Sequence, residues 1–206
     1  MHLPTTIWLP CSHTTDTSPD APAVLPDWAL DKIRAEFTRR SGDAPSPLWR
    51  LAIGDANPGM DARTPCTTEG TSGDGPHTAA GTPVILAELH PDTLPTAAPH
   101  SRYADDQHGA MDDGWPGFFH RAHHLLHTGG LLLLATRQRR DVGVLTDPLG
   151  LLVACAPTAG FRYLQHIVVV HGHAADDRIV PAPPDGSAPG LIHSDLLVLD
   201  SPGGQS

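Results

Sequence analysis

The sequence predicts an α/β fold in which a mostly parallel sheet is flanked by helices. Strand-like apolar runs alternate with helix-like segments along the C-terminal part of the chain, which is the pattern of such folds. From residue 83 the expected order is strand, helix, strand, helix, strand, then a long connection and a last strand. The run Leu131–Thr136 (LLLLAT) is continuously apolar, as expected for a strand that is buried on both faces of a parallel sheet.

The expected elements follow from hydrophobic periodicity and from the residues that begin and end helices. A helix is expected over Leu25–Arg40, because apolar residues recur there at helical spacing and Pro26 suits a first turn. The other expected elements are strands at Leu48–Ile53 and Pro83–Leu89, a helix at Trp115–His127, the strand at Leu131–Thr136, a helix at Val144–Thr158, and strands at Tyr163–His171 and Ile192–Leu199. Residues 174–190 are polar and rich in proline, and we expect a hairpin arm there.

The chain of 206 residues is long enough for one domain with a sizeable core, although only 39% of its residues are hydrophobic and 5% are aromatic. We expect one domain over residues 26–200, an irregular N-terminal arm over 1–25, and a tail over 201–206. Residues 54–82 contain many Gly, Thr, Pro and Asp and show no apolar periodicity. They predict a loop or a disordered insert, which is unusually long for a compact domain.

The charge and cysteine content limit the partners and the compartment. The formal net charge of −10 repels DNA phosphates, so any nucleic-acid contact needs a local basic patch. The dense candidate is Arg137, Arg139 and Arg140, for which a solvated loop after a strand is the simpler interpretation. Three scattered cysteines argue against a disulfide framework and fit a reducing cytosol. Without a signal-peptide pattern or a long apolar run, we expect a soluble cytoplasmic protein.

Four stretches of the sequence carry a resemblance to a known family. They are Pro4–Trp8 with Thr14-Thr15, Pro22–Pro26 running on to Asp43, Leu125–Leu131, and Ala159–His171 answered by His193–Val198. In that order they are similar to the opening arm, the helix before the cofactor loop, the Gly-Gly turn into the fifth strand, and the sixth and seventh strands of actinobacterial DNA methyltransferases of the amino-methylating type. The resemblance implies a Rossmann-like class I methyltransferase fold, S-adenosylmethionine as cofactor and DNA as partner.

The resemblance also implies where the cofactor would bind, and the sequence departs from the family there. Family members hold the cofactor with a glycine loop after the first strand, because only glycine lets the backbone approach closely. The counterpart here lacks the Asp/Glu-x-x-x-Gly-x-Gly pattern, and residues 54–82 leave little room for the elements that carry the acidic ribose partner. We therefore expect a sheet that is truncated or incomplete in its N-terminal half. The candidate cofactor residues are Pro22, Gly54, Asp55 and Gly59.

The catalytic motif differs as well. Family enzymes end the fourth strand with Asp/Asn/Ser-Pro-Pro-Tyr/Phe, in which polar oxygens accept hydrogen bonds from the target amino group and the aromatic ring stacks on the flipped base. The corresponding segment here reads Glu88-Leu89-His90-Pro91-Asp92 and contains no aromatic residue. The candidate catalytic residues are Glu88, His90 and Pro91. The sequence therefore predicts a degenerate methyltransferase with weak or no catalysis.

Two alternatives remain open at the level of sequence. One is an active but divergent methyltransferase with an unrecognised cofactor loop. The other is a non-catalytic binding or regulatory module that is metal-loaded through a His-rich helix. His120 and His124, and likewise His123 and His127, are spaced i,i+4 and would share a helix face. A solvated histidine-rich face is the simpler interpretation, and no metal ligand is assigned.

Overall fold

The computed structural model describes residues 4–10, 24–38, 48–53, 67–69, 82–90, 115–141, 144–183 and 190–202. Most strands of this part form one mixed sheet with the order β1-β8-β11-β5-β4-β2-β3. The strands are β1 Thr5–Trp8, β2 Leu48–Ile53, β3 Thr67–Glu69, β4 Thr82–Leu89, β5 Leu126–Thr136, β6 Arg139–Asp141, β7 Val144–Thr146, β8 Arg162–Val170, β9 Gly172–Ala175, β10 Arg178–Pro181 and β11 His193–Ser201. The helices are α1 Asp27–Phe37, α2 Trp115–Leu125 and α3 Leu149–Cys155, which continues as the 3-10 turn Ala156–Ala159.

The directions of the strands confirm the predicted α/β fold with a mostly parallel, Rossmann-like sheet. β2, β4 and β5 are parallel neighbours, and β1 is parallel to β8. The last strand, β11, inserts antiparallel between β5 and β8, so β8 runs in the same direction as β5. The carboxyl ends of β1, β2, β4, β5 and β8 therefore meet at one edge of the sheet, where β11 begins. We call it the carboxyl edge.

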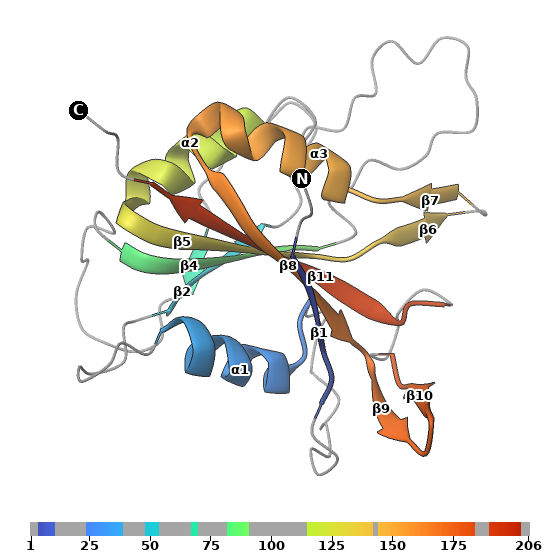
Figure 1. Ribbon diagram of the computed structural model, residues 1–206. Helices are drawn as coiled ribbons and strands as arrows, with labels where there is room; N and C mark the ends of the chain where they lie inside the picture. The colour runs from blue at the N-terminus through green and yellow to red at the C-terminus, as the bar shows by residue number, and fades with distance from the viewer. Residues whose placement is uncertain are drawn as a thin grey trace, which may run out of the picture.

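Helices cover both faces of the sheet, with α2 and α3 on one side and α1 on the other (Figure 1). The central strand β5 supplies alternate residues to two separate cores. Leu132 and Leu134 pack toward Trp115 and Phe119 of α2, whereas Leu133 and Ala135 join the core that α1 covers. All four β5 residues from 132 to 135 are fully buried, which explains why this strand lacks the polar alternation of a half-exposed strand.

The N-terminal arm is not irregular throughout, contrary to the prediction. Thr5–Trp8 forms β1, which pairs in parallel with His166–Val169 of β8. Trp8 is 3% exposed, and its ring lies 6.4 Å from that of Phe37 at the end of α1. Burial of this indole and the open edge of β8 together order a segment whose Pro/Thr-rich composition indicates a loop.

All three expected helices are shorter than predicted, and α1 spans only Asp27–Phe37 of the expected Leu25–Arg40. The segment predicted as a helix over 144–158 begins with β7, because Val144–Thr146 pairs with β6 in a hairpin. The helix α3 begins only after Pro148, and the Asp147 carboxylate accepts a hydrogen bond of 2.9 Å from the Leu149 amide. The helix α2 ends at Leu125 rather than His127, because β5 begins at Leu126.

The sheet beyond β2 is short in the described part of the chain. There the only strand outside β2 is β3, three residues long and antiparallel to β2. It forms within the segment 54–82, which was predicted as a loop; the remainder of that segment lies outside the described residues. None of the described helices combines the length and the apolar character that crossing a membrane requires.

Candidate functional site

Buried polar side chains gather at the carboxyl edge. Ligands of open α/β sheets bind at this edge, where loops follow the strand ends. Most of the buried polar or charged residues of the described chain lie here: Thr136, Arg137, His171, Ser194 and Asp195. Since polar groups are buried only when they are held by partners or serve a site, this edge is the candidate functional site.

An ion pair joins the neighbouring parallel strands β2 and β4. The Arg50 guanidinium of β2 donates to the Glu88 carboxylate of β4 at 2.5 Å, and the Glu88 side chain is only 10% exposed. The register explains the contact: Ala52 pairs with Glu88, and Arg50 stands two residues earlier on the same face. Oε1 of Glu88 and Nε of Arg50 are buried and have no hydrogen-bond partner. The catalytic candidate Glu88 thus points one oxygen along the sheet toward β2.

The other candidates taken from the resemblance are placed only in part. His90 follows the end of β4 at the carboxyl edge and is partly buried, so the structure brings Glu88 and His90 to the same strand end. Ile53 is in register with Leu89, so β2 and β4 end side by side. The remaining candidates, Pro91, Pro22, Gly54, Asp55 and Gly59, lie outside the described residues.

A chain of hydrogen bonds fixes the approach to α1. The Ser194 hydroxyl donates to the Val24 carbonyl at 2.7 Å, and His171 Nε2 lies 2.8 Å from the same hydroxyl. Because the serine proton is used toward Val24, His171 must donate through Nε2. Burial first, and then the nearby charges of Arg137 and His193, lower the pKa of His171 to about 4. The imidazole is therefore neutral at pH 7, and it pins the start of α1 to β8 and β11.

A second cluster lies on the opposite face of β11. The buried Asp195 carboxylate accepts a hydrogen bond of 2.8 Å from His166 Nε2, and His193 Nε2 lies 3.8 Å from the same oxygen. The Asp195 side chain is 4% exposed. The carboxylate therefore joins β11 to β8 through the His166 ring. Sequence reasoning treated these residues as ordinary strand positions, because their meeting depends on the register between β8 and β11; the His193-Ser194-Asp195 run was the available signal.

Of the two histidine pairs, His120 and His124 both lie in α2, whereas His123 and His127 do not share a helix face. His127 lies in β5 beyond the end of α2, and its Nδ1 donates to the Thr128 carbonyl at 2.8 Å. His123 packs edge-on against Phe161, with ring centroids 5.3 Å apart. Within the described ranges, no group of three or more His, Cys, Asp or Glu residues could hold a metal ion.

The basic run also differs from the predicted solvated loop. Arg137 is buried, with 7% of its surface exposed, and it follows β5 directly at the carboxyl edge. Arg139 and Arg140 belong to β6, which pairs with β7 in a two-stranded hairpin. The three arginines thus lie on ordered backbone beside the start of β11, and Arg137 among them is buried.

Comparison with known proteins gives structural likeness only. No protein-family model matches the chain, and no curated protein matches it. Among solved structures it is similar to a candidate DNA modification methylase of Thermus thermophilus. The form complexed with S-adenosyl-L-methionine shows 19% identity and a TM-score of 0.40 over 76% of this chain and 57% of that one. Two further forms give TM-scores of 0.38 and 0.34, with 15% and 20% identity over 76% and 64% of this chain and 56% and 48% of theirs. The chain thus spans about half the length of these structures.

Proposed function

We propose that this chain is a methyltransferase-like protein related to S-adenosylmethionine-dependent DNA methyltransferases, with weak or no catalysis of its own. The sheet topology supports the relationship, because the reversed last strand between β5 and β8 leaves the parallel strand ends free to form a ligand edge. The sequence resemblance in the turn into β5 and along β8 and β11 supports the same relationship.

The ion pair of Glu88 with Arg50 carries the proposal of weak or lost catalysis. Methyl transfer to an amino group needs a polar oxygen at the end of the fourth strand that is free to accept a hydrogen bond from that group. In this chain the Glu88 carboxylate is held by a guanidinium at 2.5 Å, and little of its side chain is exposed. No aromatic residue follows Glu88 before Tyr103. A flipped base would meet a carboxylate that Arg50 already engages, and it would find no aromatic side chain in the described residues at the end of β4.

The described residues at the ends of β2 and β4 do not make a complete binding site for the cofactor. S-adenosylmethionine, when bound, supplies an electrophilic methyl group. Glu88 is the carboxylate that the described ends of β2 and β4 offer, and Arg50 already engages it. A ribose would need an acidic partner with free oxygens. We therefore assign no described residue to the cofactor and derive no step through it.

DNA is the substrate class that the resemblance implies, and charge works against tight binding. The formal net charge is −10, so the phosphate backbone is repelled except near the arginines that follow β5. We expect weak DNA binding that falls further as salt is raised.

An active divergent methyltransferase is the second candidate, favoured by the Oε1 atom of Glu88, which has no hydrogen-bond partner. Transfer of a radiolabelled methyl group from S-adenosylmethionine to double-stranded DNA distinguishes the two. The first proposal expects no transfer above that of heat-inactivated protein. Transfer that disappears in Glu88→Gln, but persists in Asp31→Asn on the exposed surface of α1, would establish the active enzyme instead.

A further inference from the structure

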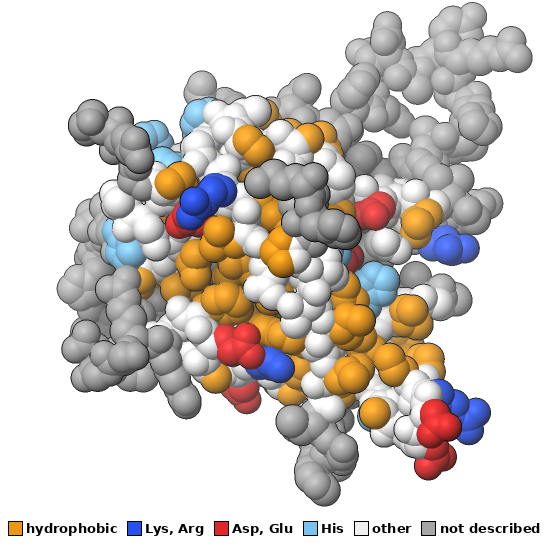
Figure 2. All heavy atoms as spheres, in the orientation of Figure 1, with side chains coloured by type: hydrophobic (Ala, Val, Ile, Leu, Met, Phe, Trp, Pro, Cys, Tyr) orange, Lys and Arg blue, Asp and Glu red, His pale blue; other side chains and the backbone are white. Residues whose placement is uncertain are grey.

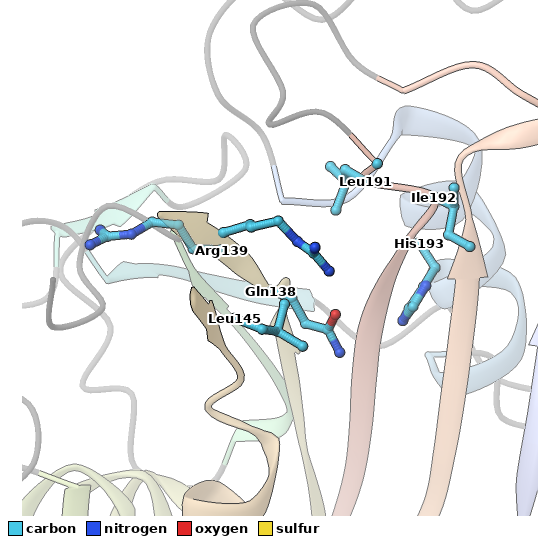
Figure 3. A pocket seen from close by; sticks show the side chains of 8 residues that line it. Gln138, Arg139, Leu145, Leu191, Ile192 and His193 are labelled. Carbon is cyan, nitrogen blue, oxygen red and sulfur yellow. The ribbon is translucent and has the colours of Figure 1, made fainter. Parts of the chain in front are cut away.

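A small pocket lies between the β6–β7 hairpin and the segment that leads into β11 (Figure 3). Gln138, Arg139, Arg140 and Leu145 line one side, and Ile192 and His193 line the other. The pocket holds about 50 Å³ of space. Figure 3 shows Gln138 and His193 projecting into the gap between the two segments. It is separate from the ends of β2 and β4, where the proposed function would place the cofactor.

The charged groups around the pocket favour an anion. Two guanidinium groups and an imidazole line it, and the buried cation of Arg137 stands immediately before it in the chain. The side chain of Arg140 is exposed, and no ion pair of Arg140 occurs within the described part of the chain.

Among the side chains that the structure describes, two carboxylates lie near the pocket, and both are engaged with its own polar groups. Asp147 accepts a hydrogen bond of 3.3 Å from Gln138, and its other oxygen accepts the Leu149 amide. Asp195 lies 3.8 Å from His193 and accepts a shorter bond from His166. These contacts orient the Gln138 amide and the His193 ring. The exposed guanidinium of Arg140 is then the charge that faces a ligand.

The size and the rim of the pocket narrow the class of anion. A cavity needs roughly 10–15 Å³ in this measure to hold one water molecule, so the pocket has room for a small polar group. Arginine forks bind phosphate oxygens in pairs, which suits a phosphoryl group. Leu145 and Ile192 are 48% and 50% exposed beside the pocket, so they offer apolar contact to whatever the group is attached to. Figure 2 shows that other apolar side chains gather on the surface between α1 and α2 and extend toward the β9–β10 hairpin.

We propose that this pocket binds the phosphoryl group of a phosphate ester, either a free nucleotide or the backbone of a nucleic acid. Arg140 would supply the exposed guanidinium contact, Gln138 would donate a hydrogen bond from the same wall, and His193 would donate one from the opposite wall. The inference does not rest on methyl transfer, because it needs neither the cofactor edge nor Glu88.

The test is a titration of the ¹⁵N-labelled full chain with inorganic phosphate, adenosine monophosphate and a short single-stranded oligonucleotide, followed by amide shifts. We expect saturable shifts of the amides of Gln138–Arg140 and Ile192–His193 with at least one phosphate ester. Arg140→Ser should weaken this binding about tenfold, since it removes a charge-assisted pair. Arg178→Ser is the matched control, because Arg178 is an exposed arginine in the other two-stranded hairpin, β9–β10.

The three ligands separate the sources of the phosphoryl group. Binding of phosphate and the mononucleotide without the oligonucleotide identifies a free phosphate ester, whereas tighter binding of the oligonucleotide at the same amides identifies a nucleic-acid backbone. The proposal is overturned if no ligand shifts these amides, or if Arg178→Ser weakens binding as much as Arg140→Ser. A separate titration with S-adenosylmethionine tests cofactor binding. Its outcome does not change how the titrations with phosphate, the mononucleotide and the oligonucleotide are interpreted.

Discussion

At the scale of single residues, the hydrogen bonds of His171 connect the sheet to the start of α1. The imidazole is 4% exposed and donates to Ser194, which in turn donates to the Val24 carbonyl. The backbone of His171 is also held on both sides, by the Ile192 carbonyl at 2.8 Å and the Ala182 amide at 3.0 Å. A protonated imidazole at this position would be buried beside the cation of Arg137.

Protonation of His171 should therefore destabilise the fold at acid pH. Its pKa falls from 6.5 to about 4 on folding, so only the unfolded chain takes up the proton between these values. The contribution to stability is complete above pH 6.5 and is lost as pH falls toward 4. From pH 7 to 4.5 the loss amounts to about 2 kcal/mol. Urea unfolding of the wild type and of His171→Gln at pH 7 and pH 4.5 measures this loss of unfolding free energy.

The glutamine variant is the informative comparison because its amide can still donate to Ser194 but does not titrate. Other carboxylates and histidines change stability over the same range in both proteins, so only the difference between them is assigned to His171. Equal losses of unfolding free energy in the two proteins would show that His171 does not control this pH dependence.

At the scale of elements, the Arg50–Glu88 ion pair ties β2 to β4 beneath the carboxyl edge. Arg50→Met leaves a carboxylate that is 10% exposed without its cation, and we expect a loss of about 2 kcal/mol in unfolding free energy. The double variant Arg50→Met, Glu88→Leu should recover most of that loss, because it removes both charges. Chemical unfolding of the wild type, the two single variants Arg50→Met and Glu88→Leu, and the double variant gives the coupling energy. A coupling near zero would mean that the pair does not stabilise the strand contact.

The turn from α3 into β8 depends on Gly160. This residue has φ +91°, in the left-handed region, and an added Cβ would lie 3.3 Å from His123 Nε2. We expect Gly160→Ala to cost about 1–2 kcal/mol, read as a lower midpoint of thermal unfolding. Gly150→Ala is the control, since Gly150 lies in α3 with open space around it, and alanine should stabilise that helix slightly. Equal effects of the two substitutions would contradict the role given to the Gly160 turn.

The elements also show which parts of the fold the sequence could predict. The predicted bounds of β2 are correct, and those of β4, β8 and β11 differ from the structure by one or two residues. These strands could be predicted because a strand buried in a sheet appears in the sequence as a long apolar run. The strand β1 was missed because its stability comes from pairing with β8 and from burial of Trp8, both of which are tertiary. The helix expected over 144–158 was wrong at its start, because Val144–Thr146 pairs with the preceding basic strand before Pro148 allows a helix to begin.

At the scale of the whole molecule, the α/β class and the order of the C-terminal strands followed from sequence, and the site followed only in part. The resemblance pointed to the end of β4, and the structure places Glu88 and His90 there. It could not indicate that Arg50 engages Glu88, nor that His166 and His193 meet at Asp195. Those contacts depend on which strands are neighbours and in what register, and β11 reaches its place between β5 and β8 only in the folded sheet.

The central claim is that the methyltransferase-like sheet no longer supports effective use of S-adenosylmethionine. Isothermal titration calorimetry of the full chain with S-adenosylmethionine tests it most directly. Because the segment after β2 lacks the Asp/Glu-x-x-x-Gly-x-Gly pattern of a cofactor loop, we expect no saturable heat at micromolar cofactor. A dissociation constant in the micromolar range would contradict the claim and would favour an active, divergent methyltransferase.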